Sequence, residues 1–373
     1  MKSPLFLLII LILFMLFSSA AVSDTQESND SHLVSDINKS SMDAAEQKED
    51  TIDDIGFIKD GYSGQKKDNK RHGAGYMIWA DGNIYAGQWQ NDKRHGHGVM
   101  TMPDGSIYAG QWKDDKKDGL YSISYSDNKK YVGECKDHGP SGQGTMIWPD
   151  GKKYTGEWME GKSHGKGTLL YADGGKYEGM FANDSPSGQG TMTWPDGRKY
   201  TGQWIEGRSY GKGTLLYADG RKYEGSFENG EPKGRGTMTW PDGKKNDGQW
   251  LKGKAHGKGI EINPDGSKYD GFFANGSYNG QGTITLPDGS KYTGQWKNGK
   301  ANGEGTATYT DGSQYKGEWE NGKPQGRGVA LKPDGSKYDG QWEDGKPHGI
   351  GVTTRPDNTQ QAGRYENGEF IGD

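Results

Sequence analysis

The chain has 373 residues, a net charge of −5, 64 glycines, 12 tryptophans and 21 tyrosines, but only 29% hydrophobic residues. Disordered chains are poor in aromatic residues, so this composition excludes disorder along most of the length. The single cysteine excludes an intramolecular disulfide framework and a cysteine-based metal site, and no basic segment typical of nucleic-acid binders is present. Glycine combined with aromatic residues favours short strands and tight turns, in which rings supply most of the buried area.

The N-terminal segment has the pattern of an export signal. Lys2 precedes an apolar run from Leu5 to Phe17, and small residues follow it at positions 18–23. The pattern predicts a signal peptide over residues 1–23. An uncleaved membrane anchor is the alternative, because the apolar stretch is nearly long enough to span a bilayer. In both cases the remainder is expected outside the cytosol: periplasmic, extracellular or membrane-anchored.

Residues 24–55 are predicted to form an acidic, disordered linker. Between residues 24 and 61 there are 11 acidic and 3 basic side chains, and aromatic residues are almost absent. This stretch accounts for the negative charge of the chain, so the segment that follows is close to neutral. We therefore expect the folded domain to occupy residues 56–373.

From residue 62 onward a pattern of 23 residues recurs fourteen times without insertion. Each repeat has glycine two positions after its first residue, and twelve of the fourteen have an aromatic residue two positions further on. We name each repeat after its first residue. The repeats begin at Tyr62, Tyr85, Tyr108, Tyr131, Tyr154, Tyr177, Tyr200, Tyr223, Asn246, Tyr269, Tyr292, Tyr315, Tyr338 and Gln361.

The first half of each repeat predicts a strand with one aromatic and one polar face. In the segment 154–158 tyrosine, glycine and tryptophan alternate with threonine and glutamate, the period of a half-buried strand. A turn follows, commonly Asn-Gly, and then Gly-x-Gly opens a second strand. Where the turn glycine is missing, we expect the substitutes to have positive φ. These substitutes are Asn69, Asp92, Asp115, His138 and Asp184.

A second turn joins each repeat to the next, and it contains Pro-Asp in eight repeats. Aspartate stands at this position in all thirteen such turns, and glycine or asparagine follows it. This pattern predicts a type I turn followed by a left-handed residue, the three-residue hairpin loop with a bulge. The register that follows places Met146 opposite Tyr154 and Gly144 opposite Gly156. Asp150 and its equivalents are therefore turn residues rather than catalytic carboxylates.

These elements predict an all-β protein. The expected fold is an elongated single-layer antiparallel β-meander of about fourteen hairpin repeats, after a signal segment and a disordered linker. A lone hairpin is marginally stable, so the stacking of neighbouring repeats must supply the stability. We expect the glycines of the aromatic face to make room for the ring of the next repeat.

The repeat pattern Tyr-x-Gly-x-Trp-x-x-Gly-x-x-x-Gly-x-Gly, followed by Asp-Gly, resembles the MORN repeat (membrane occupation and recognition nexus). The segment 292–305 fits it without exception, and the resemblance covers residues 62–373. It implies a twisted β-meander, often dimeric, that serves as a scaffold or membrane-proximal binding module. Catalysis in this family belongs to an attached domain, for which the repeats leave no room. The export signal departs from the cytosolic setting common among eukaryotic relatives.

The aromatic face is the candidate partner surface. Two interpretations remain open: the face is the buried core of a one-layer fold, or a curled sheet leaves part of it as a groove for a peptide, a protein, a glycan or another copy of the chain. The candidate residues are Trp148, Tyr154, Trp158, Trp194, Tyr200, Trp204, Trp240, Trp250, Tyr292 and Trp296.

Five histidines share one position before Gly-x-Gly, and metal binding by neighbouring repeats is one interpretation of them. Other repeats have serine, asparagine, glutamine or lysine there, which favours a solvated loop because a metal site needs a fixed set of ligands. These histidines are His72, His95, His164, His256 and His348. Cys135 stands where other repeats have Trp or Phe, so a small buried hydrophobic residue is expected.

The sequence therefore predicts an exported, non-enzymatic repeat scaffold or binding module for protein, envelope or membrane components. We expect no catalytic residues, no metal, no cofactor and no nucleic-acid partner. A protein partner or self-association, including a homodimer, is expected. The alternative is a module that binds acidic phospholipid, against which the near-neutral charge of the repeats argues.

Overall fold

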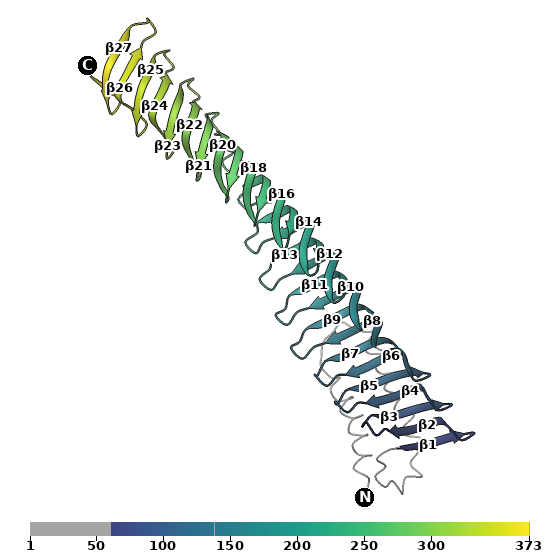
Figure 1. Ribbon diagram of the computed structural model, residues 1–373. Coiled ribbons are helices and arrows are strands. Elements are labelled where there is room, and N and C mark those ends of the chain that lie inside the picture. The colour runs from purple at the N-terminus through teal and green to yellow at the C-terminus, as the bar shows by residue number, and fades with distance from the viewer. Residues whose placement is uncertain (1–60, 138, 373) are drawn as a thin grey trace. The chain divides into compact units, whose positions relative to one another are not determined.

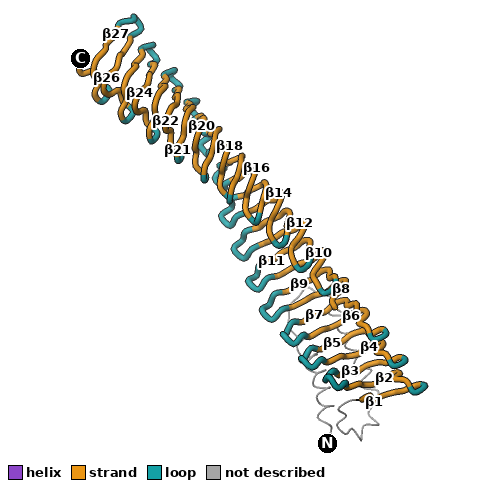
Figure 2. Tube along the Cα trace, viewed as in Figure 1, coloured by secondary structure: helices purple, strands orange, loops and turns teal. Residues whose placement is uncertain are grey.

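The computed structural model describes residues 61–137 and 139–372. The expected signal segment, the whole of the expected linker (residues 24–55) and residues 56–60 of the expected folded domain lie outside these residues. The described chain consists of strands and turns without a helix (Figure 2), so no helix within it could span a membrane. It divides into two compact parts, which are described separately. The N-terminal part runs to Gly174 and includes Phe181–Asp184; the C-terminal part comprises Gly175–Met180 and the residues from Ser185 onward.

Each repeat contributes a first strand of about seven residues and a second of about nine. In the N-terminal part these are β1 (Gly61–Lys67), β2 (Lys70–Ile78), β3 (Ile84–Gln90), β4 (Lys93–Thr101), β5 (Ile107–Lys113), β6 (Lys116–Ser124), β7 (Lys130–Asp137), β8 (Gly139–Ile147), β9 (Lys153–Met159) and β10 (Lys162–Leu170). The strand at the division of the two parts is β11 (Lys176–Ala182).

The C-terminal part continues the same alternation of strand lengths. Its strands are β12 (Ser185–Thr193), β13 (Lys199–Ile205), β14 (Arg208–Leu216), β15 (Lys222–Glu228), β16 (Glu231–Thr239), β17 (Lys245–Leu251), β18 (Lys254–Ile262), β19 (Lys268–Ala274), β20 (Ser277–Thr285), β21 (Lys291–Lys297), β22 (Lys300–Thr308), β23 (Gln314–Glu320), β24 (Lys323–Leu331), β25 (Lys337–Glu343), β26 (Lys346–Thr354), β27 (Gln360–Glu366) and β28 (Glu369–Gly372).

The predicted fold class is confirmed. Within each part every strand pairs antiparallel with the next strand along the chain, so hairpins follow one another as a meander (Figure 1). The predicted register is also confirmed in β8 and β9, where Met146 pairs with Tyr154 and Gly144 with Gly156.

The Pro-Asp turn has the predicted three-residue geometry. The Trp148 amide donates to the Lys152 carbonyl (2.8 Å), and Gly151, with φ of 88°, donates its N–H to the Trp148 carbonyl (3.0 Å). The Asp150 carboxylate accepts the Lys152 amide at 2.9 Å. The recurrent aspartate is therefore occupied by its own turn.

The turn within each repeat has two successive left-handed residues, as in Asn298 (φ 50°) and Gly299 (φ 83°). This is the mirror-image type I′ turn, which matches the twist of antiparallel strands. Asn69, Asp92, Asp115 and Asp184 also have positive φ, which confirms the expectation for these substitutes. His138 lies outside the described residues.

Beyond this turn the ladder has a bulge that the sequence analysis does not predict. In β9 and β10 Trp158 pairs with Ser163, and Gly156 pairs with Gly167. The two pairs are therefore four residues apart on β10 but only two residues apart on β9. Gly165, the first glycine of Gly-x-Gly, absorbs the extra length with a left-handed φ of 59°. Glycine adopts this conformation without the steric cost that other residues carry.

The core of each repeat is a tyrosine ring that lies over glycine backbone. A Cβ on Gly213 would lie 2.6 Å from two ring carbons of Tyr200, so only glycine fits there. The covering ring comes from the same repeat, which corrects the expectation of a ring from the next one. The physical reason is the register: Leu215 pairs with Tyr200, so the tyrosine ring reaches the glycine two residues before Leu215.

The aromatic rings form a ladder of edge-to-face contacts, which we call the aromatic ladder. In the C-terminal part the Tyr200 ring meets Trp204 at 5.1 Å and Phe227, of the next repeat, at 4.8 Å between centroids. The polar groups of these rings are satisfied: the Tyr200 hydroxyl donates to the Gln203 carbonyl (3.1 Å), and Trp204 Nε1 donates to the Gly190 carbonyl (3.1 Å). Aromatic packing with satisfied polar groups thus replaces an aliphatic core.

The opposite face of the strands is exposed as predicted, although it is not uniformly polar. Large apolar side chains stand on it, among them Ile205 with 50% and Ile262 with 43% of its surface exposed. Lysines and threonines occupy most of the neighbouring positions on the same face. The face therefore has isolated apolar residues in a polar surround, which is normal for a protein surface.

Candidate binding site on the aromatic face

The ten candidate residues of the aromatic face fall into two groups. Seven are buried by the chain itself, with 1–9% of their surface exposed: Tyr154, Trp158, Tyr200, Trp204, Trp250, Tyr292 and Trp296. The other three, Trp148, Trp194 and Trp240, are half-buried. A partner could therefore contact only the second group and any place where the aromatic ladder opens.

The half-buried tryptophans precede the Pro-Asp turns, and a cation lies over each ring. The cation is the lysine or arginine four residues later, 4.6–5.3 Å from the ring centroid. Such contacts are worth on the order of 0.5–1 kcal/mol at exposed sites. These rings are thus partly covered by their own repeats. The pairs are Trp148 with Lys152, Trp194 with Arg198, and Trp240 with Lys244.

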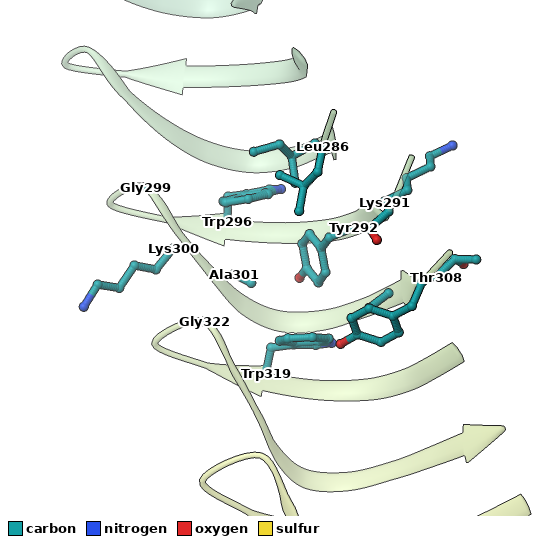
Figure 3. Close-up of a pocket in the computed structure, with 14 residues that line it drawn as sticks. Leu286, Lys291, Tyr292, Trp296, Gly299, Lys300, Ala301, Thr308, Trp319 and Gly322 are labelled. Atoms are coloured by element: carbon teal, nitrogen blue, oxygen red, sulfur yellow. The ribbon is translucent and has the colours of Figure 1, made fainter. Parts of the chain in front are cut away.

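The ladder opens in the C-terminal part, at a pocket of about 320 Å³ between Trp296 and Trp319 (Figure 3). These two tryptophans come from β21 and β23, and Tyr292 lies between them. Ala301 and Ala307, both on β22, also line the pocket. Its wall is therefore mainly aromatic and apolar.

Two small residues of the same repeat line the pocket. Ala307 pairs with Tyr292, at the position where Met238 pairs with Tyr223 in an earlier repeat. Met238 is 2% exposed and covers its tyrosine completely, whereas Tyr292 retains 8% exposure. The second small residue, Ala301, pairs with the pocket tryptophan of its own repeat. The shortened side chains leave space that the backbone, held by the strand ladder, does not close.

The pocket has charge only at its rim. Lys291 and Lys300 are exposed and extend away from it on opposite sides in Figure 3, and no acidic residue is among those that line it. Burial raises the pKa of Tyr292 to about 12, and the negative charge of Glu304 adds to the rise. Tyr292 is therefore neutral at physiological pH, and its hydroxyl donates to the Gln295 carbonyl at 3.0 Å.

A second pocket, of about 410 Å³, lies in the N-terminal part beside Trp89. Its charges are already paired: Arg71 Nε lies 3.3 Å from Asp92 Oδ1, and Arg94 Nε lies 3.0 Å from Asp115 Oδ1. The Arg71 guanidinium also lies over the Trp89 ring, 4.2 Å from its centroid. The side chains of this pocket are thus engaged with one another.

A buried polar cluster interrupts the aromatic ladder at Asn246, which replaces the usual tyrosine. Glu261, 6% exposed, accepts hydrogen bonds from Tyr278 (2.7 Å) and Asn246 (3.2 Å), and it pairs with Lys244 at 2.9 Å. The Tyr278 ring stacks on Tyr269 at 3.7 Å. The signal in the sequence was a glutamate at a position where most repeats have Met, Leu or Ile.

The described residues hold no group of three or more His, Cys, Asp or Glu side chains placed to bind a metal. His348 Nε2 instead lies 3.1 Å from the Glu343 carboxylate. Cys135 is 3% exposed, as expected of a small buried hydrophobic residue. Burial raises the pKa of its thiol to about 12, so the reactive thiolate is scarce at neutral pH.

Several solved structures are similar to the chain, with low scores. The TCP domain of Drosophila melanogaster SAS-4 is 10% identical, with 48% of this chain and 98% of that chain covered and a TM-score of 0.29. The TCP10 domain of Danio rerio CPAP is 13% identical, with 76% and 99% covered and a TM-score of 0.20. Virginiamycin B lyase of Staphylococcus aureus is 12% identical, with 74% and 86% covered and a TM-score of 0.13. At these TM-scores the likenesses carry no inference about this chain.

No curated protein matches the chain. The family model of the MORN repeat, by contrast, matches thirteen segments between residues 62 and 360. Twelve of its segments begin at the predicted starts, from Tyr62 to Tyr338, and one begins at Asp247, a residue after the predicted Asn246. The fourteenth repeat lies beyond these matches and is formed by β27 and β28. The chain therefore belongs to the MORN repeat family.

Proposed function

We propose that this chain is an exported, non-enzymatic repeat scaffold that binds a protein partner. The observation that carries the proposal is the pocket of about 320 Å³ between Trp296 and Trp319, where two alanines leave apolar space beside Tyr292 in the aromatic ladder. Elsewhere the chain covers most of its ladder rings with its own side chains. Apolar pockets with a polar rim are typical of interaction sites.

Two further observations support the proposal that the chain is non-enzymatic and that it is exported. The recurrent carboxylates, such as Asp150 and Asp196, accept backbone amides of their own turns, which supports a structural role for them. Export is supported by the sequence pattern of residues 1–23, which lie outside the described residues.

The test has two measurements on the full-length chain. The first locates the native chain by cell fractionation; recovery in the cytosol would remove export from the proposal. The second captures partners from the envelope fraction by cross-linking, and then measures binding of each purified candidate to the wild type and to Ala307→Met. Loss of binding in this variant is expected because methionine fills the pocket. Sedimentation of the same samples shows whether the partner is a second copy, which would be the homodimer form of the proposal.

Binding of acidic phospholipid is the second candidate function. One observation favours it: in the C-terminal part successive first strands begin with exposed lysines, spaced by two strands or about 9.6 Å. These are Lys199, Lys222, Lys245 and Lys268. The ion pair of Lys222 with Glu224 (2.9 Å) reduces the charge of this row. Flotation with acidic liposomes at several salt concentrations tests this candidate function. Binding that does not depend on the salt concentration, or no binding, would exclude it.

A further inference from the structure

The shape of the pocket points to the kind of side chain that would fill it. In four other repeats of the C-terminal part a proline stands at the position of Ala301, whereas Ser209, Ala255 and Tyr278 stand there in three. Pro324 pairs with Trp319, as Ala301 pairs with Trp296, and Pro232 pairs with Phe227 in the same way. The fold therefore seats a prolyl ring opposite the ladder aromatic in these repeats, and the Tyr292 repeat lacks it.

In two other repeats the prolyl ring lies beside a turn glycine of the following repeat. A Cβ on Gly345 would lie 3.8 Å from Cδ of Pro324, and one on Gly207 would lie 3.9 Å from Cδ of Pro186. A Cβ on Gly322, which donates its N–H to the Ala301 carbonyl, would meet no atom within 4 Å. Gly322 lines the pocket, and Ala301 lacks the Cγ and Cδ atoms that a proline would place beside it.

The two rim lysines also lack the acidic partners that some equivalent lysines have. Lys337 pairs with Asp339 at 3.0 Å, but the residue two positions after Lys291 is Thr293. The described residues offer Lys291 no ion pair. Its charge is therefore available to a carboxylate supplied from outside.

The second rim lysine, Lys300, also lacks an acidic partner. Lys323 pairs with Asp344, twenty-one residues later, at 3.0 Å. The residue twenty-one positions after Lys300 is Asn321, which carries no charge, and Lys300 has no ion pair within the described part of the chain. A ligand that crosses the pocket would thus meet one unpaired cation on each side.

We propose that this pocket binds a proline in an extended, acidic segment of a partner protein. The prolyl ring lies in the pocket beside Ala301, between Trp296 and Trp319, and carboxylates on either side of it pair with Lys291 and Lys300. Proline carries little conformational entropy to lose on binding, and aromatic grooves accept it readily. The proposal rests on the proposed function as a protein-binding scaffold and specifies the partner's chemistry.

The test uses the full-length chain and a short synthetic peptide with a central proline between glutamates. Binding is expected to weaken with added salt, because exposed charges contribute to it. Two matched peptides serve as probes of specificity, one with alanine in place of the proline and one with lysines in place of the glutamates. Both are expected to bind at least about tenfold more weakly, a free-energy difference near 1.4 kcal/mol. Equal binding of all three peptides would overturn the proposal.

Ala301→Pro supplies the ring from the chain itself and should abolish peptide binding while the chain stays folded, as judged by circular dichroism. Ala255→Pro is the matched control, because Ala255 pairs with Trp250 at the same register away from the pocket. Peptide binding by the control and not by Ala301→Pro supports the proposal. If a captured partner binds Ala301→Pro as it binds the wild type, this inference falls and the proposed function stands. If neither peptide nor partner binds the wild type, both fall.

Discussion

The Tyr223 and Tyr292 repeats have the same backbone register, but the first is closed and the second is open. In the Tyr223 repeat, Pro232 pairs with Phe227 and Met238 pairs with the tyrosine. In the Tyr292 repeat both of these positions carry alanine. The exposure of the tyrosine rises from 0% to 8%, and a pocket of about 320 Å³ appears.

The difference shows how a repeat protein separates stability from binding. The glycines, turns and aromatic ladder are common to both repeats, so the backbone does not depend on the two variable positions. Because each repeat contacts mainly its neighbours, one repeat can lose side-chain volume while the rest of the stack keeps its stability. The two alanines thus leave an apolar pocket in the stack without a change of backbone register.

The largest expected effect is unfolding at alkaline pH. It tests the burial of the ladder tyrosine, which the Tyr223 and Tyr292 repeats have in common. Burial raises the pKa of Tyr223 and Tyr292 to about 12 from the ordinary value of 10. The unfolded chain releases these protons first, so stability is complete below pH 10 and is lost as the pH rises through about 12. The denaturation midpoint, followed by circular dichroism, should fall over this window. Conversion of all the tyrosines to tyrosinate near pH 10 without loss of structure would mean that the ladder rings are not buried.

Removal of a ladder ring should have the next largest effect. Trp204→Ala deletes a side chain that is 6% exposed and contacts the rings of Tyr177 and Tyr200. We expect a loss of roughly 3–5 kcal/mol in the free energy of unfolding. Ile205→Ala, on the exposed face of the same strand, is the control. Equal denaturation midpoints for the two variants would contradict the ladder as the core.

Met238→Ala should open the closed repeat. Met238 is 2% exposed, so its truncation leaves a cavity beside Tyr223 and costs about 2–5 kcal/mol. Chemical denaturation measures the loss, and Trp fluorescence quenching reports new solvent access. A change below 0.5 kcal/mol would show that this position does not close the repeat.

Ala307→Met should close the open repeat, with the smallest effect and the opposite sign. Burial of the added side chain against Tyr292 should raise the free energy of unfolding by about 1–2 kcal/mol, since each buried methylene contributes about 0.8 kcal/mol. Ala307→Ser gives the comparison with a polar residue of similar size, which should not stabilise. If methionine destabilised the chain, the pocket would be too narrow for the side chain that other repeats bury there.

The repeated features of the fold could be predicted because each depends on local chemistry. Asp150 and Gly151 define their turn through a side-chain hydrogen bond and a left-handed φ, and the turn then fixes which residues pair. Alternation of Tyr154 and Trp158 with polar residues identified the buried face. The bulge at Gly165 was not predicted, because a Gly-x-Gly motif alone does not say how many residues face each other across a ladder.

The candidate site was predicted only in outline. The sequence identified the aromatic face but did not separate buried rings such as Tyr200 from accessible ones such as Trp194. That separation depends on which side chains of adjacent repeats cover each ring. Ala301 and Ala307, which open the pocket, carry no chemistry that would mark them as site residues.

Sequence by itself determined the repeat length, the two turns, the strand register across the Pro-Asp turn and the family, since these follow from glycine conformation, turn hydrogen bonding and a period of two. Tertiary structure alone decided where the aromatic face is closed and where it is open. The volume of a pocket is the space that the side chains of adjacent repeats leave unfilled on a fixed backbone. The sequence of one repeat alone does not define this space. Beside Tyr292 the unfilled space is the pocket to which we assign the binding of a protein partner and of its proline.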